Sequence, residues 1–151
     1  MGFEATEIMS GHHEFADGGQ TGQLPFAFRV KWGPERLRDW VNPRHPGFLW
    51  QELSGEVQVG GLCEWTPCQG TLHLEYFPKR RIRYDFDFDV DGTAYHFVGD
   101  KKNIRLWNLL VTHFTCFGVV TERASGKLVS TSVTFFHLRH FPMLALVRWR
   151  R

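Results

Sequence analysis

The chain has 151 residues, a length that fits one folded unit, so we expect a single β-barrel domain over residues 1–151. Its composition, with 42% hydrophobic and 23% charged residues, is that of an ordinary globular protein and not of a disordered chain. The net charge of +2 gives no indication of a nucleic-acid partner, and no apolar run approaches the roughly 18 residues that a membrane helix needs.

The N-terminal segment carries Glu4 and Glu7 and lacks the basic and then apolar pattern of a secretion signal. The three cysteines are an odd number without a secretory context. We therefore expect reduced thiols and a cytoplasmic location.

Turn-forming residues separate runs of alternating side chains along the whole chain, which is typical of short antiparallel strands. Strands are expected, in chain order, near residues 3–15, 24–32, 51–60, 69–77, 80–90, 93–101, 111–121 and 128–138, with a short one at 143–150. Residues 34–42 place Leu37, Trp40 and Val41 at helical spacing after Pro34, and residues 103–110 are expected to add a second helical turn. The pattern predicts an all-β, antiparallel, lipocalin-like barrel of about eight to ten strands with one or two short helices.

The stretch YDFDFDVDG places Asp85, Asp87, Asp89 and Asp91 one residue apart. Its second half matches the start of a calcium loop, but the twelfth position of that loop is Val98, where a glutamate is required. The flanking residues alternate as in strands and do not form helices. We therefore expect these aspartates to lie on the solvent face of a strand and to bind no metal.

Asp91 and Gly92 lie between two alternating runs, which predicts a hairpin with a two-residue type I′ turn. This turn fixes the register and places aromatic residues on one face and charged residues on the other. The expected pairs are Phe88–Tyr95, Phe86–Phe97 and Tyr84–Gly99 on the aromatic face, and Asp87–His96, Asp85–Val98 and Arg83–Asp100 on the other.

A second hairpin is expected around the loop RASG. With a four-residue loop the expected pairs are Val120–Val129, Cys116–Val133, Phe114–Phe135 and Thr112–His137. The last pair lies at the end of an apolar wall, where it either orients a hydroxyl or carbonyl of a ligand or forms a hydrogen-bonded pair in the core.

The remaining polar residues give no pattern of a metal, cofactor or nucleic-acid site. Cys63 and Cys68 would need two further ligands to hold zinc, so we interpret them as thiols close to a turn, and Cys116 as a buried thiol. His12 and His13 are adjacent and point to opposite faces of a strand. In the basic run PKRRIR, Arg81 and Arg83 share the strand face of the aspartates, which neutralise them locally. No nucleotide-binding motif is present. We therefore expect neither a cofactor nor nucleic acid.

Four phrases are similar to a known module: FEATEIMSGHHEF, NPRHPGFLWQELSGEVQVGGL, YDFDFDVDGTAYHFVGDKKNI and LWNLLVTHFTCFGVV. Over residues 3–138 the chain resembles a lipocalin-like β-barrel module that is attached to bacterial oxidoreductases of the glucose-methanol-choline (cholesterol-oxidase-like) type and to some hydrolase-like proteins. The resemblance implies a barrel beside lipid or steroid chemistry and an oxidoreductase partner. It implies neither oxidase activity nor any functional residue.

The leading hypothesis is a non-enzymatic binding or accessory domain for a small apolar, lipid- or steroid-like ligand. One alternative is a small barrel enzyme that uses His137, His113 or the Asp87–His96 pair as a base. Another is a structural module that docks on a partner enzyme or forms a homodimer. Under the leading hypothesis no residue is catalytic, and the ligand-binding residues are Tyr84, Phe86, Phe88, Tyr95, Phe97, Thr112, Phe114, Phe135 and His137.

Overall fold

The computed structural model of the chain describes residues 2–17, 22–75, 81–101, 115–136 and 147–150. These residues form strands and one four-residue helix. In chain order the elements are β1 (Gly2–Phe15), β2 (Leu24–Trp32), α1 (Leu37–Trp40), β3 (Trp50–Val59), β4 (Cys63–Glu75), β5 (Arg81–Val90), β6 (Thr93–Lys101), β7 (Thr115–Glu122), β8 (Leu128–Phe136) and β9 (Val147–Arg150).

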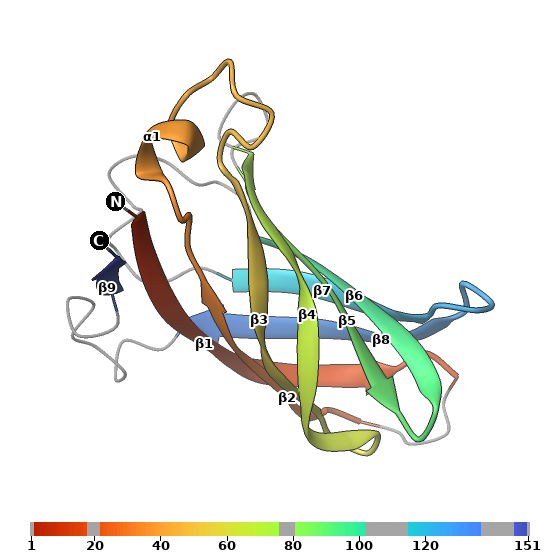
Figure 1. The fold of residues 1–151 in the computed structure, drawn as a ribbon. Helices are drawn as coiled ribbons and strands as arrows, with labels where there is room; N and C mark the ends of the chain where they lie inside the picture. The colour runs from red at the N-terminus through yellow and green to blue at the C-terminus, as the bar shows by residue number, and fades with distance from the viewer. Residues whose placement is uncertain (1, 18–21, 76–80, 102–114, 137–146, 151) are drawn as a thin grey trace.

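The strands form a closed antiparallel barrel of eight strands, β1 to β8, as the sequence predicted (Figure 1). Each strand pairs with its neighbour in the sequence, and β1 pairs on its other side with β8. β1 is long enough to pair with β2 over residues 5–13, with β8 over residues 9–15 and with β9 over residues 2–5. Closure through β1 satisfies the backbone groups that an open sheet would leave at its edges.

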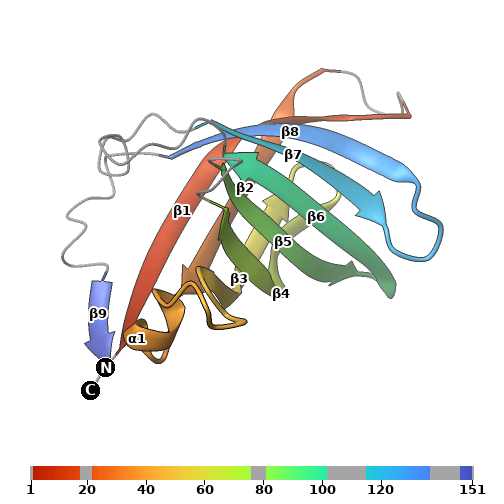
Figure 2. The ribbon, with the colours of Figure 1, turned by 90° about the horizontal axis from the view of Figure 1, so that it is seen from above.

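Successive strands run in opposite directions, so the connections between them alternate between the two ends of the barrel (Figure 2). One end has the connections 16–23, 60–62, 91–92 and 123–127, and we call it the short-turn end. The other end has the connections 33–49, 76–80, 102–114 and 137–146, and we call it the long-connection end. Helix α1 belongs to this second end. None of the helices in the described parts of the chain has the length and apolar character to cross a bilayer.

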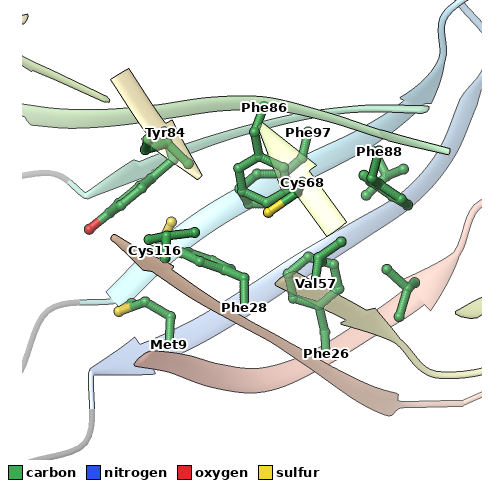
Figure 3. Close-up of a cluster of buried hydrophobic side chains, with 14 of the residues drawn as sticks. Met9, Phe26, Phe28, Val57, Cys68, Tyr84, Phe86, Phe88, Phe97 and Cys116 are labelled. Atoms are coloured by element: carbon green, nitrogen blue, oxygen red, sulfur yellow. The ribbon is translucent and has the colours of Figure 1, made fainter. Parts of the chain in front are cut away.

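Phenylalanine rings from opposite walls fill the middle of the barrel (Figure 3). Ring centroids lie 4.7 Å apart for Phe86 and Phe97, 5.4 Å for Phe26 and Phe97, and 5.5 Å for Phe28 and Phe97. All four side chains are fully buried. They are inward residues of strands in which every second side chain faces the interior, so alternation in the sequence produces the core directly.

The Phe97 ring lies against two glycines that pair across β6 and β7, Gly99 and Gly118. A Cβ atom at Gly118 would lie 2.3 Å from the Phe97 ring, and one at Gly99 would lie 2.6 Å from it. Both distances are shorter than any real carbon contact. The missing side chains therefore provide the space that the central ring occupies.

The first predicted hairpin is confirmed in every pair. Val90 lies opposite Thr93 and the expected register follows along β5 and β6. Asp91 and Gly92 both have positive φ, 50° and 85°, as a type I′ turn requires.

The aspartates of β5 lie on the outer face, as predicted. On this face three carboxylates each contact an arginine or a histidine. Arg83 Nε donates to Asp100 Oδ1 at 2.9 Å, and an Arg123 nitrogen lies 2.7 Å from Asp87 Oδ1. His96 Nε2 lies 2.6 Å from Asp85 Oδ1, so its side-chain partner is the diagonal residue and not Asp87, which lies directly opposite in the register. Among the described residues, no group of three or more His, Cys, Asp or Glu side chains could hold a metal ion.

The second predicted hairpin is wrong by one residue. A register shift between Val120 and Thr121 places Val120 opposite Ser130, where the sequence predicted Val129. A one-residue slip exchanges the two faces of a strand. The inward residues of β8 are therefore Ser130, Ser132 and Thr134, small enough to lie beside the Phe97 ring, while Phe135 lies on the outer face with 42% of its surface exposed.

Two further boundaries differ from the predictions. β4 starts at Cys63 and not near residue 69, because residues 63–68 already pair with β3. Pro67 lies within this paired stretch. The helix covers only 37–40. The predicted helical turn at 103–110 and the residues Thr112, His113, Phe114 and His137 lie outside the described residues.

We expect Phe86→Ala and Phe97→Ala each to lower the free energy of unfolding by about 3–5 kcal/mol, because each truncation leaves a cavity in the ring cluster. Asp89→Ala, on the exposed face of the same hairpin, should change it by less than about 0.5 kcal/mol. Urea unfolding curves of the three variants test this. A larger loss for Asp89→Ala than for either phenylalanine would mean that β5 presents its faces the other way round.

Candidate functional site

Four polar side chains meet inside the barrel at the long-connection end. We call Glu7, Trp32, Tyr84 and Lys101 the polar cluster; they come from β1, β2, β5 and β6. Tyr84 Oη donates to Glu7 Oε1 at 2.8 Å, and Trp32 Nε1 donates to Glu7 Oε2 at 3.3 Å. Lys101 Nζ forms an ion pair with the same Glu7 oxygen that Tyr84 contacts. The Glu7 carboxylate is thus the centre of the cluster.

The Glu7–Lys101 pair is buried, with Lys101 only 3% exposed. Removing two charges from water costs several kcal/mol for each ion, and their mutual attraction only roughly compensates for this cost. A gain in stability is therefore a poor explanation for this buried ion pair, which lies in a barrel whose middle is filled by apolar rings. It does provide a fixed set of donors and acceptors in a place that excludes most water.

Tyr84 in the cluster and Cys116 near it both stay protonated, because their surroundings raise the pKa of each side chain. Burial, followed by the negative charge of Glu7, raises the pKa of the Tyr84 hydroxyl well above its ordinary value. Burial raises the pKa of the Cys116 thiol to about 12, although the positive charge of Lys101 and a hydrogen bond with Thr134 act to lower it. Cys116 is therefore no nucleophile at neutral pH. What the cluster offers is hydrogen bonding around one ion pair.

A groove of about 810 Å³ lies beside the cluster, between the 33–49 connection and the ends of β2 and β3. We call it the tryptophan groove, because Trp32, Trp40 and Trp50 line it together with Gln51 and Leu53. Trp32 belongs to both features, since its indole N–H donates to Glu7 while its side chain lines the groove. Trp32 is therefore the side chain that the groove and the polar cluster share.

Gln51 has an unused donor at this place. The Trp40 indole N–H donates to Gln51 Oε1, which fixes the orientation of the amide. Gln51 Nε2 is buried and has no hydrogen-bond partner among the described residues, although the side chain is one of those that line the groove. A buried donor without a partner costs about 1–3 kcal/mol, and a ligand acceptor would remove this cost.

The predicted ligand-binding residues have three different outcomes. Tyr84, Phe86, Phe88 and Phe97 lie inside the barrel, and the Tyr95 ring stacks on Phe88 at 5.5 Å. Phe135 lies on the outer face of the barrel, because the register of β7 and β8 differs by one residue from the predicted one. Thr112, Phe114 and His137 lie outside the described residues. Of the residues placed inside, only Tyr84 reaches the polar cluster, and its hydroxyl points away from the phenylalanine rings (Figure 3).

Sequence analysis did not select Glu7, Lys101, Trp32 or Gln51, yet a signal for one of them was present. Lys101 continues the inward series of Tyr95, Phe97 and Gly99 by one more step, and the confirmed register places it opposite Ile82. A lysine on an aromatic face is unusual enough to be noted. Its approach to Glu7 depends on closure of the barrel and could not be inferred from either strand.

A second buried polar residue, His13, lies near the short-turn end. Its Nε2 lies 2.7 Å from the carbonyl oxygen of Gly60, whereas its Nδ1 has no partner among the described residues. Burial lowers the pKa of this imidazole, and the hydrogen bond to Gly60 opposes the shift only in part. The side chain packs edge-on against Phe15 and Phe26, so it belongs to the core at this end.

No family model, no curated protein and no solved structure matches the chain. The geometry of the site therefore carries the functional argument.

We expect Glu7→Gln and Lys101→Met each to destabilise the protein by about 3–5 kcal/mol, because each leaves one buried charge without its partner. The double variant removes both charges and should lose less than the sum of the two single losses. Urea unfolding of the four proteins as a double-mutant cycle measures this coupling. Strictly additive losses would show that the two side chains do not interact in solution.

The unfolding free energy should fall as the pH falls below about 6.5, where the unfolded chain takes up a proton on His13 that the folded state resists. The contribution of His13 is complete above that pH, and its slope is at most about 1.4 kcal/mol for each pH unit. His13→Gln should reduce the slope, whereas His12→Gln, on the opposite face of β1, should not. Equal slopes for the wild type and His13→Gln would contradict this assignment.

Proposed function

We propose that the protein is a non-enzymatic binding protein for a small, largely apolar molecule with one hydrogen-bonding group. The molecule binds at the long-connection end of the barrel, with its apolar part in the tryptophan groove. Its polar group approaches the cluster around Glu7 and Lys101. The observation that carries the proposal is that Trp32 both lines the groove and donates a hydrogen bond to Glu7 of the buried ion pair.

The composition of the site supports this class of ligand. Small-molecule sites are concave, have volumes of about 300–1,000 Å³, and combine apolar walls with a few fixed polar groups. The tryptophan groove has a volume of about 810 Å³, and three indoles, Leu53 and the Gln51 amide line it together with six charged side chains. The ion pair neutralises itself, which favours a hydroxyl or a carbonyl over a free carboxylate as the ligand group.

Because aromatic rings fill the middle of the barrel, we place the proposed site at the barrel mouth and not in the deep interior. The rings of Phe26, Phe28, Phe86 and Phe97 are in van der Waals contact with one another, so we assign them to the core rather than to the ligand. This keeps the apolar ligand that the sequence predicted, but places it at the mouth. A lipocalin-like accessory role beside an oxidoreductase stays a prediction, supported by the resemblance of residues 3–138 alone.

A docking module is the second candidate, and the outer face of β7 and β8 favours it. Phe117 and Phe135 are 55% and 42% exposed there, and Phe117 also lines a groove of about 710 Å³. Sedimentation of the purified protein tests for a homodimer through this face. A monomer that still binds small ligands would favour the binding protein.

Titration of 1-dodecanol, dodecanoic acid and a sterol against tryptophan fluorescence tests the proposed function. We expect a Kd below about 100 μM for at least one ligand with a hydroxyl, because burial of apolar surface contributes about 25 cal/mol per Å² before the costs of association. Glu7→Gln combined with Lys101→Met should weaken this affinity about tenfold. Glu64→Gln, an exposed residue of β4 outside the groove, should leave it unchanged.

Two results would contradict the proposed function. The first is that no ligand of the panel binds below about 100 μM. The second is that the double variant binds as tightly as the wild type, which would separate binding from the polar cluster.

A further inference from the structure

The Gln51 amide provides a buried hydrogen-bond donor at the long-connection end. Gln51 is only 4% exposed, and it begins the inward series of β3 that continues with Leu53. Its partner in the register of β4 is Leu72, which is also buried. Leucine side chains carry no polar group, so neither of these two neighbours can accept a hydrogen bond from the amide.

The orientation of the amide follows from its contact with Trp40. An indole N–H can only donate, so the atom that it contacts must be the amide oxygen, Gln51 Oε1. The amide nitrogen, Nε2, is therefore directed away from the indole and has two hydrogens to donate. Among the residues that line the tryptophan groove, Gln51 contributes the one buried side-chain atom without a partner in the described part of the chain, and this atom is Nε2.

The register of the strands places Gln51 next to the polar cluster. Trp32 lies opposite Leu53 in the pairing of β2 and β3, so Gln51 is the diagonal neighbour of Trp32. Diagonal neighbours in an antiparallel pair lie about 7–8 Å apart, within the reach of long side chains. The Trp32 indole in turn donates to Glu7. The unused donor and the cluster therefore occupy adjoining inward positions at the same end of the barrel.

The carboxylate of the cluster, in contrast, already has its donors. Glu7 Oε1 accepts from Tyr84 and Lys101. Glu7 Oε2 accepts from Trp32. A ligand hydroxyl would bring a hydrogen that needs an acceptor here, and a buried donor without an acceptor is costly. A carbonyl oxygen brings lone pairs and no hydrogen, so the donors and acceptors at this end favour a carbonyl.

We propose that the site selects ligands whose polar group is a carbonyl, with Gln51 Nε2 donating to the carbonyl oxygen. This deepens the proposed function and rests on it, because it decides between the two neutral groups, hydroxyl and carbonyl, that the proposed function allows. The probe is 2-decanone, and 2-decanol is its matched comparison. The two molecules have the same chain and carry the oxygen on the same carbon.

The first measurements use the wild-type protein. Titration against tryptophan fluorescence should give an affinity for 2-decanone about three- to tenfold higher than for 2-decanol, the size expected for one net hydrogen bond. In proton–nitrogen correlation spectra, 2-decanone should move the side-chain NH₂ signals of Gln51 downfield. The NH₂ signals of Gln58, which donates to Glu64 and does not line the groove, should not move.

Two variants of Gln51 and one control locate the effect. Gln51→Met removes the donor and should abolish the preference for 2-decanone. Gln69→Met makes the same change at an exposed glutamine that lines the same groove, and it should preserve the preference. Gln51→Glu keeps an oxygen for the Trp40 indole but replaces the unused donor by an acceptor, so at about pH 8, where a glutamate is ionised, 2-decanol should bind more tightly than 2-decanone.

The possible results separate this inference from the proposed function. Equal affinities for 2-decanone and 2-decanol in the wild type would overturn the carbonyl inference, and so would a preference that survives Gln51→Met. Wild-type Gln51 signals that do not move with bound 2-decanone would overturn it without any variant.

If 1-dodecanol binds through Glu7 and Lys101 and 2-decanone is not preferred over 2-decanol, the inference falls and the proposed function stands. If 2-decanone binds through Gln51 and the double variant of Glu7 and Lys101 binds it as tightly as the wild type, the carbonyl site stands and the role of the polar cluster falls.

Discussion

Closure of the sheet through β1 is the constraint on which the rest of the structure depends. β1 pairs with β2 on one side and with β8 on the other, so the first strand can complete its hydrogen bonds only when the eighth has been placed. Once the sheet is closed, the alternation of side chains defines an inside and an outside. Every later property, from the ring cluster to the buried ion pair, follows from which residues closure turns inward.

The inside of an eight-stranded barrel is narrow, and large aromatic rings use most of its middle. Phe97 fits there because Gly99 and Gly118 have no side chains, and β8 contributes only small hydroxyl side chains next to it. Space is therefore divided along the barrel axis. The middle provides stability by ring packing, while the long-connection end holds a buried ion pair.

The polar cluster and the tryptophan groove are the parts of this end to which we assign the proposed ligand. Trp32 joins the two, because one ring donates a hydrogen bond to Glu7 and also lines the groove. Helix α1 is short, but it ends with Trp40, and the indole of Trp40 orients the Gln51 amide. These side chains are thus fixed by hydrogen bonds among themselves, and under the proposed function this would lower the entropic cost of binding.

The sequence alone was sufficient for the fold class, for most strands and for the complete register of the hairpin at Asp91–Gly92, because period-two alternation and type I′ turn residues are local signals. It was not sufficient for the hairpin of β7 and β8. There a register shift at Val120–Thr121 reversed the faces of β8 and moved Phe135 from the expected inner wall to the surface.

The candidate site depended on tertiary structure to an even greater degree. Glu7 and Lys101 are 94 positions apart in the chain and become a pair only when β1 and β6 face each other across a closed barrel. Alternation determines that a side chain points inward, and this could be read from each strand. Which inward side chains meet is decided by strand order, closure and the space that neighbouring rings leave, and none of these is encoded within a single strand.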